Sequence, residues 1–389
     1  MSFLRLRQYV VIAGSTLVMS AFSMAQRATV TVQNPIDTAR PSETIVLAVS
    51  DLQKALNVDD VRRVHVVDEK TGKEILTQTV DTNDDGKFEQ FIFQADIAPK
   101  ETRKFTLGVG NRQELKSSDF GAYGRFVRER RDDFAWENDR IAHRMYGAAL
   151  ETWAQEPLTS SAVDVWTKRT RRLIVNDWYM VDDYHRDHGE GADLYSSGAT
   201  RGCGGNGIWI DGKLYPSANF RNTRVLANGP VRVMFELMYD VWDAHGARVT
   251  ETKRITLDAG QNLNHFESLY TVTGEAKDIK TAMGIRKTPD SAKSFDAKQG
   301  ILRTWEGVKD AGQLGCAILV DPTRTPSEAE DAKNFFVVQD MPGDSISYYS
   351  GFGWTKSGDF PTVESWDRYL SDSAARFRAP VKVSLEKMP

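Results

Sequence analysis

The sequence is poor in the residue types that build several common kinds of site. It contains two cysteines and six histidines among 389 residues. Two cysteines, Cys203 and Cys316, are too few for a disulfide-rich scaffold, and a chain of this length buries a large core without one. A bridge between them stays open as an alternative that the fold does not require.

The chain also has no excess of positive charge. Its formal net charge is −4 at pH 7, whereas domains that bind nucleic acids carry basic patches. The sequence has no Walker motif, no dinucleotide-binding fingerprint and no Gly-x-Ser-x-Gly elbow. These absences argue against a nucleic-acid partner, a nucleotide cofactor and an α/β-hydrolase.

Apolar runs long enough to span a membrane are missing as well. The run Tyr9–Phe22 follows Arg5 and Arg7 and precedes Ser23-Met24-Ala25, and it is shorter than the span of about 20 residues that a membrane helix needs. Its flanks predict a signal peptide, residues 1–25, with a retained anchor helix as the alternative. Cleavage removes two arginines and no acids, so the charge of −4 becomes −6. We therefore expect a periplasmic or secreted protein without a stable membrane span.

Short alternating runs follow the signal. Turn residues separate them, which is typical of a small β-sandwich, and we expect this first domain over residues 26–110. Polar residues 111–120 then suggest a linker. The predicted strands are Ala28–Val32, Thr44–Val49, Val61–Val67 and Phe88–Phe93.

Residues 81–86 of this domain resemble the start of a calcium loop. Oxygen-bearing side chains alternate from Asp81, and Gly86 is sixth, but the twelfth position is Ile92 in place of the bidentate glutamate. An Asp-Gly turn between two strands explains the same residues without an ion. A hairpin is therefore the favoured interpretation, and a divalent metal remains an alternative.

The rest of the chain is also rich in β-patterned segments and poor in helical periodicity. A region of this length with little helix predicts a large double-sheet sandwich, residues 118–389, and a mostly all-β protein. We expect helices only at Pro326–Asn334 and Val363–Phe377. The predicted strands are Gly124–Arg130, Phe134–Tyr146, Leu173–Trp178, Val231–Trp242, Ala247–Leu257 and Leu263–Thr273.

The densest group of chemically active side chains lies in a predicted loop, Asp182–Tyr195. One interpretation is a metal site made by His185, His188, Glu190 and Asp193, although their spacing fits no standard motif. A second makes His185 and Tyr195 proton-transfer groups that neighbouring acids orient. The third is a solvated loop held by its own hydrogen bonds. The second interpretation is the one we favour.

A second mixed segment is Phe134–Tyr146. Alternate residues of a strand share a face, so Trp136 and Arg140 lie on one side and Glu137 and His143 on the other. Neither face is apolar, which indicates a sheet face that lines a polar cleft, or else an exposed ladder of ion pairs. We expect this strand to face the loop Asp182–Tyr195, with His185 as the most function-critical histidine. His265, on a different predicted strand, is more often a structural residue in such a position.

Four segments together resemble a family of exported bacterial proteins. That family is known chiefly as a domain of unknown function and is found among enzymes that degrade pectin and other uronate polysaccharides. The resemblance covers nearly the whole mature chain and implies a sandwich similar to galactose-mutarotase-like proteins and to several polysaccharide lyases. It assigns a role to no residue. The segments are Asp133–Arg140, Asp182–Asp193, Asn228–Arg232 and Gly353–Gly358.

From these residues we expect an enzyme that acts on uronate-containing oligosaccharides or polysaccharides by β-elimination. This reaction needs a cation beside the carboxylate, a base for the C5 proton and an acid for the leaving oxygen. Arg140 or Arg201 is the candidate cation, His185 or His143 the base, and Tyr195 the acid.

Two alternatives remain. A glycoside hydrolase needs two carboxylates, for which Glu190 could pair with Asp193 or Glu137. A non-catalytic carbohydrate-binding protein would need only aromatic platforms. The mixture of imidazole, phenol, guanidinium and carboxylate in one loop favours an enzyme over such a binder. The candidate platforms are Trp136, Trp178 and Trp209.

Overall fold

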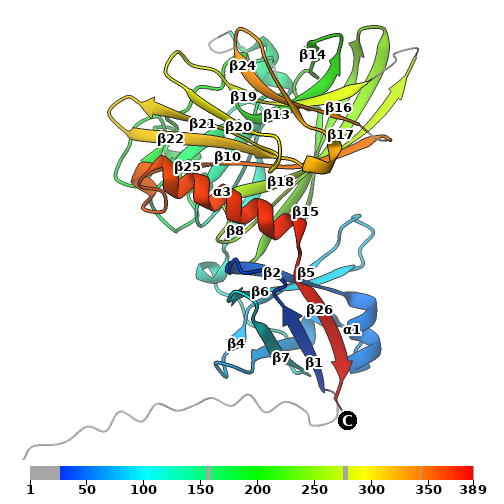
Figure 1. The fold of residues 1–389 in the computed structure, drawn as a ribbon. Coiled ribbons are helices and arrows are strands. Elements are labelled where there is room, and N and C mark those ends of the chain that lie inside the picture. The colour runs from blue at the N-terminus through cyan, green and yellow to red at the C-terminus, as the bar shows by residue number, and fades with distance from the viewer. Residues whose placement is uncertain (1–26, 155–157, 160, 275–278, 342, 389) are drawn as a thin grey trace, which may run out of the picture.

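The computed structural model describes residues 27–154, 158–159, 161–274, 279–341 and 343–388. The predicted signal peptide, residues 1–25, lies outside them. The chain folds into a small and a large β domain (Figure 1). No helix in the described ranges is long and apolar enough to cross a membrane.

The small domain is the expected β-sandwich. One sheet has the order β26-β1-β7-β3-β4 and the other the order β2-β6-β5. Phe93 of the second sheet packs edge to face on Phe105 of the first, with 5.0 Å between ring centroids. The strands are β1 (Arg27–Gln33), β2 (Arg40–Ala48), β3 (Val64–Asp68), β4 (Glu74–Ile75), β5 (Thr77–Val80), β6 (Gln90–Ile97), β7 (Thr102–Val109) and β26 (Lys382–Lys387).

Both ends of the chain contribute to this small domain. Strand β26 pairs antiparallel with β1, so residues near the C-terminus complete the N-terminal sheet. A helix, α1 (Val49–Leu56), follows β2 and buries Leu52 and Leu56 in the same core. The predicted large domain, residues 118–389, includes this last strand, which the structure pairs with β1 of the small domain.

The large domain is a double-sheet sandwich. Its longest sheet has eight antiparallel strands: β15 (Asn222–Ala227), β16 (Arg232–Ala244), β17 (Ala247–Asp258), β18 (Leu263–Thr273), β25 (Ser345–Trp354), β22 (Gly312–Leu319), β21 (Ile301–Val308) and β20 (Ala292–Asp296). Two five-stranded sheets complete it. The first is β14 (Lys213–Tyr215), β13 (Cys203–Ile210), β19 (Lys280–Arg286), β24 (Asn334–Asp340) and β23 (Ser327–Glu330). The second is β12 (Gly191–Ala192), β11 (Asp164–Lys168), β10 (Ala142–Tyr146), β9 (Asp133–Asn138) and β8 (Ala122–Val127).

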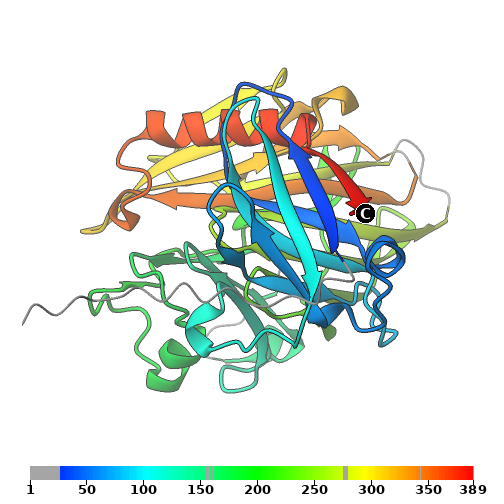
Figure 2. The ribbon, with the colours of Figure 1, turned by 90° about the horizontal axis from the view of Figure 1, so that it is seen from below.

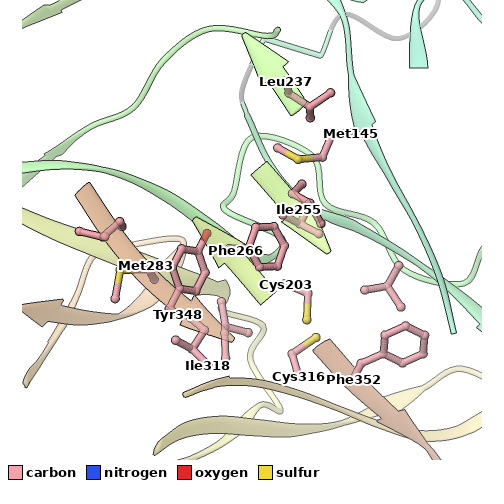
Figure 3. Packing of buried hydrophobic residues seen from close by; sticks show 14 of the residues in the cluster. Met145, Cys203, Leu237, Ile255, Phe266, Met283, Cys316, Ile318, Tyr348 and Phe352 are labelled. Atoms are coloured by element: carbon pink, nitrogen blue, oxygen red, sulfur yellow. The ribbon is translucent and has the colours of Figure 1, made fainter. Parts of the chain in front are cut away.

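The core of the sandwich lies between the eight-stranded sheet and the shorter sheets (Figure 3). Ile255 and Phe266 enter it from the long sheet, and Met283 enters it from β19. Cys203 and Cys316 are both fully buried there, and both are free thiols. The mostly all-β fold predicted from the alternation of apolar residues is thus confirmed.

Helices were predicted less well. The predicted helix Val363–Phe377 is confirmed as α3 (Val363–Arg378). The predicted helix Pro326–Asn334 is wrong, because this segment forms β23 and pairs with β24 along the sheet edge. The predicted strand Leu173–Trp178 is also wrong: residues from Val175 form α2 (Val175–Val181), which packs its apolar side on Trp166.

The predicted strand Phe134–Tyr146 is a hairpin of two strands. Strands β9 and β10 pair with each other, and the chain turns between Asn138 and Ala142. The side chain of Asn138 accepts the backbone N–H groups of Arg140 and Ile141 and so closes the turn. The predicted hairpin after Asp81 is confirmed, since β5 and β6 pair across that loop.

Two parts of the molecule, helix α3 and the small domain, cover parts of the outer face of the eight-stranded sheet. Helix α3 packs Trp366 and Leu370 on one part of this face. The small domain covers a second part, where Val80 and Ile92 pack against Met234. Viewed from the side of the small domain, the two covers lie next to each other (Figure 2). The surface between them carries both charged and aromatic side chains, and it forms the groove described below.

Candidate functional site

The structure brings the predicted loop and the predicted strand segment together. Arg144 of β10 donates to the Asp193 carboxylate at 2.7 Å and to Asp164 at 2.8 Å. Asp133 of β9 lies 3.4 Å from the same guanidinium. All four side chains are buried. The contact between loop and strands is therefore a buried ion network.

Burial dominates the chemistry of this network. It raises the pKa of the Asp133 carboxyl from 3.8 to about 6, although Arg144 and Arg130 act in the opposite direction. It also raises the pKa of Asp193 well above its usual range. Tyr179 donates to Asp133 at 2.9 Å. Arg144 thus faces three carboxylates that are removed from solvent.

The loop residues predicted to be most reactive lie at the surface. The His185 side chain is 65% exposed, and its Nδ1 lies 3.4 Å from Asp193 Oδ2. His188 contacts the exposed Asp183 at 2.8 Å. Glu190 forms an ion pair with Arg172, which lowers the pKa of its carboxyl. The four residues of the predicted metal site do not gather their ligand atoms at one point in the described structure.

His143 is buried and has both ring nitrogens engaged. Its Nδ1 lies 3.0 Å from the Asp164 carbonyl oxygen, and its Nε2 lies 3.0 Å from the Asn264 amide nitrogen. Burial lowers the pKa of His143 to about 4. Its ring stacks on the equally buried Trp136, so neither side chain reaches solvent.

Tyr195 and Arg201 are also buried. The Arg286 guanidinium lies 3.7 Å from the centre of the Tyr195 ring, and burial raises the pKa of the phenol. Burial lowers the pKa of Arg201 to about 10. Arg140 is part-exposed and forms an ion pair with Asp359 at 2.7 Å.

The remaining predicted residues support the fold. Trp178 stacks on Trp166, and Trp209 packs against Phe336. The buried Glu137 accepts Lys168 Nζ at 2.6 Å. None of the residues predicted for the site lines the groove between the domains. Their functional roles stay predictions.

That groove is a cavity of about 520 Å³ between the small domain, the eight-stranded sheet and the end of α3. Alternation along four neighbouring strands creates its floor, because residues two apart point to the same side. Phe266 thus enters the core, whereas Leu263, His265 and Glu267 point outward. The floor residues from the other strands are Arg232 and Met234 of β16, Arg254, Thr256 and Asp258 of β17, and Tyr349 of β25.

Three aromatic rings stand in a row along this groove. His265 and Tyr349 are paired neighbours on β18 and β25, and their rings stack with centroids 4.6 Å apart. Phe377 of α3 stacks on Tyr349 at 3.6 Å. Phe377 is 39% exposed, and it is the one aromatic residue among the large exposed apolar side chains of the described chain. Phe377 thus leaves aromatic surface exposed at one end of the row.

His265 and Tyr349 hold their protons differently. Burial lowers the pKa of His265, and Glu267 offsets part of this effect. Burial raises the pKa of Tyr349 to about 12. His265 is therefore neutral at pH 7 and Tyr349 is protonated. His265 Nε2 lies 2.7 Å from Ser347 Oγ, and its Nδ1 lies 3.9 Å from Glu267.

Four arginines line the groove, and three of them have carboxylate partners. These ion pairs are Arg40–Glu43 at 2.9 Å, Arg232–Asp258 at 2.6 Å and Arg254–Glu236 at 2.7 Å.

Arg376 is the exception. It is 6% exposed, and no acidic side chain in the described ranges lies within ion-pair distance. Its partners are the Ser373 hydroxyl and the Tyr369 ring, while its Nε has no hydrogen-bond acceptor among the described residues.

One group of carboxylates in the described structure lies close enough to share a metal ion. Oxygen atoms of Asp81, Asp85 and Glu89 lie within 4.8 Å of one another. The Asp81 carboxylate already accepts four backbone N–H groups of its own turn, from Asn83 to Gly86. These bonds explain the turn without an ion.

The sequence does not predict the groove, because the residues that line it are far apart in the chain. Arg40, Arg232, His265, Tyr349 and Arg376 come from five separate elements. The signal that could have found it was the outward face of Leu263–Thr273, where His265 and Glu267 alternate with the core residue Phe266.

Comparisons with known sequences place the chain in a family. The family model described as "Domain of unknown function (DUF4861)" matches residues 32–383. A protein named "Uncharacterized protein P7" from Formosa agariphila is 32% identical over 394 residues, which cover 96% of this chain and 98% of that protein.

Two solved structures from Enterococcus faecalis share the fold at 10% identity and a TM-score of 0.53. One is described as an alpha-mannosidase, and this chain matches it over 92% of its own length. The other is described as a protein in the Glycosyl Hydrolase Family 38 and is matched over 94% of this chain. The chain spans about half of each solved chain, 46% and 48%.

Proposed function

The chain belongs to the family described as a domain of unknown function (DUF4861), and we propose that it is an exported carbohydrate-active enzyme. In this proposal the groove between the domains binds a uronate-containing oligosaccharide or polysaccharide and the enzyme cleaves it by β-elimination. The glycosidase names of the two structural neighbours suit a carbohydrate ligand. The location, periplasmic or secreted, follows from the predicted signal peptide.

The observation that carries the proposal is the unpaired cation at Arg376. A buried charge is costly unless it is paired and hydrogen-bonded. Arg376 has neutral partners and a free Nε at the wall of the groove. A ligand carboxylate would supply the missing charge. An anionic sugar therefore fits this groove better than a neutral one.

The aromatic row supports the sugar part of the ligand. A pyranose ring has an apolar face that packs on aromatic side chains, and exposed apolar surface in a groove marks a binding site. Phe377 supplies such a surface beside Tyr349.

The proposed elimination assigns two groups to two proton transfers. Neutral His265 takes the C5 proton while the electrons of the C–H bond form the new double bond and the bond to the leaving oxygen breaks. Tyr349 then protonates that oxygen. The proposal takes the tautomer in which His265 Nε2 donates to Ser347 Oγ, 2.7 Å away. Nδ1 is then the accepting atom, and Glu267 stabilises the imidazolium that forms. Arg376 neutralises the carboxylate, which favours loss of the C5 proton.

The two rings stack face to face and line the same groove, so in this proposal the acid and the base act from the same face of the sugar. This arrangement predicts a syn elimination. The roles predicted for His185, Tyr195 and Glu190 are tested in the same assay.

The experiment incubates purified protein with pectic and other uronate oligosaccharides and follows ultraviolet absorbance of the unsaturated product. Arg376→Ala should lower kcat/KM roughly ten- to hundred-fold, the value of a charge-assisted hydrogen bond. Arg368→Ala, which removes an exposed arginine from the same helix, is the matched control.

Three results would overturn parts of the proposal. New reducing ends without absorbance would indicate hydrolysis. Binding without a product would indicate a carbohydrate-binding protein. Loss of activity in His185→Ala with full activity in His265→Ala would move the site to the loop Asp182–Tyr195.

A further inference from the structure

The groove does not end at the aromatic row. A second hollow of about 660 Å³ shares Tyr349 and Phe377 with it. A third hollow of about 290 Å³ shares Arg254 and Glu267 with the groove. The second and third hollows meet at Arg324 and Ser347. The three form one branched depression on the outer face of the eight-stranded sheet.

Arg324 stands where the two side hollows meet. It ends a short 3₁₀ turn, η4 (Pro322–Arg324), and the next residue, Thr325, has the left-handed φ of 47°. Its Nη1 is buried without a hydrogen-bond acceptor among the described residues. Its one acidic neighbour in the described ranges, Asp321, lies 4.0 Å away, the outer limit of an ion pair.

This arrangement resembles that of Arg376 in the main groove, although the Arg324 side chain is 33% exposed and Arg376 is nearly buried. In each place an arginine nitrogen is removed from water, lacks an acceptor and lines a hollow. The aromatic pair Tyr349 and Phe377 lies on the boundary between the two hollows. A chain of sugars that packs on this pair therefore has an arginine on either side.

We infer that the depression binds several consecutive sugar residues and that Arg324 binds a second anionic group, on a different residue from the one held by Arg376. The inference rests on the proposed function. The group recognised is a carboxylate or a sulfate ester, since both present oxygen acceptors and negative charge to a guanidinium. Arg324 is in this account a specificity residue for longer, multiply charged chains.

The test measures kcat/KM, or Kd where no cleavage is found, for uronate oligosaccharides of increasing length. Wild-type values should improve with length until a chain reaches both arginines. Arg324→Gln should remove roughly ten-fold or more of that improvement and leave the shortest substrate unchanged. Arg368→Ala is the control for loss of an arginine, and thermal melting checks that each variant folds.

Matched chains with and without sulfate esters identify the group. A loss in Arg324→Gln confined to sulfated chains assigns a sulfate, and a loss on plain uronate chains assigns a carboxylate. If kcat/KM or Kd improves with oligosaccharide length equally in Arg324→Gln and in the wild type, while Arg376→Ala is impaired, this inference is overturned and the proposed function is not. No binding or cleavage of any chain by the wild-type protein would overturn the proposed function with it.

Discussion

The imidazole of His265 lies face to face with the phenol ring of Tyr349, with 4.6 Å between the ring centroids. The two residues sit opposite each other on paired strands, so the register of β18 and β25 fixes the contact. Burial lowers the pKa of His265 and raises the pKa of Tyr349, because it disfavours the charged form of each group. A proton acceptor and a proton donor therefore stand side by side in the groove.

The first prediction concerns the pH dependence of kcat/KM. In the proposed elimination His265 must be neutral to accept a proton, so activity should fall as the pH drops through its pKa. That pKa is lowered, which places the acid limb below the ordinary value of 6.5. Tyr349 keeps its proton up to a pKa of about 12, so we expect no alkaline limb before the protein unfolds. The measurement is a pH–rate profile of the wild-type protein.

His265→Ala should lower the rate on the order of 10²–10⁴-fold, as loss of a general base does. His245→Ala removes an exposed histidine from a hairpin turn and serves as the control. An acid limb above pH 6.5, or equal rates for the two variants, would contradict His265 as the base.

The second prediction separates the hydroxyl of Tyr349 from its ring. Tyr349→Phe retains the stacking on His265 and Phe377, so Kd for the oligosaccharide should stay near the wild-type value. The rate should fall on the order of 10²–10⁴-fold, because the proposed proton donor is lost. Tyr215→Phe, in β14 of the five-stranded sheet that does not contain Tyr349, is the control. A variant Tyr349→Phe with wild-type kcat would rule out the phenol as the acid.

The third prediction concerns Arg144 and the stability of the large domain. Its guanidinium is buried among Asp133, Asp164 and Asp193. Arg144→Met leaves three carboxylates without their common cation, and breaking such a buried pair costs about 3–5 kcal/mol. Arg128→Met, at an exposed position directly after β8 of the same sheet, should cost little. Denaturant unfolding of both variants measures the difference, and similar midpoints would contradict the assignment.

The fourth prediction follows from the pKa of Asp133, which is about 6 in the folded protein and about 3.9 in an unfolded chain. The folded state binds a proton more tightly, so this contribution to stability is complete below about pH 4. It is lost as the pH rises through 6, and it amounts to roughly 3 kcal/mol.

Asp133→Asn removes this contribution. The stability of the wild type relative to the variant should therefore fall between pH 4 and pH 7, as measured by unfolding at several pH values. A constant difference across that range would show that Asp133 does not take up a proton there.

The strands of the large sandwich could be predicted because their apolar residues alternate. In Leu263–Thr273, Phe266 and Tyr270 fill the core, and the same alternation puts His265 outside. The helix at Val363–Arg378 was visible for a related reason: Trp366, Leu370 and Ala374 recur at helical spacing and pack on the sheet. Where one side of a strand or helix is buried, the spacing of apolar residues in the sequence therefore shows which of the two it is.

The failures have equally specific causes. Ser327–Glu330 is a short edge strand, and its structure is decided by its pairing with β24. A local sequence pattern does not show which distant strand a segment pairs with. The hairpin at Asn138–Ala142 depends on one amide that caps a turn. The groove depends on the register of four strands and on a helix that ends beside them. Arg376 and Arg40 meet there from opposite ends of the chain, which a sequence pattern does not reveal.

The last prediction concerns the two cysteines, because the sequence does not decide whether they form a disulfide bond. Cys203 and Cys316 come from β13 and β22, are fully buried and are not bonded to each other. Cys203 Sγ lies 3.2 Å from the Gly351 carbonyl oxygen. Burial raises the pKa of the Cys316 thiol well above its usual range. Only the thiolate reacts readily with a disulfide reagent, and neither sulfur reaches solvent.

We therefore expect no labelling by an aromatic disulfide reagent in the native protein and two labelled thiols per chain after denaturation. A protein that yields no thiol after unfolding without reductant would contain a Cys203–Cys316 bond and would contradict the free pair.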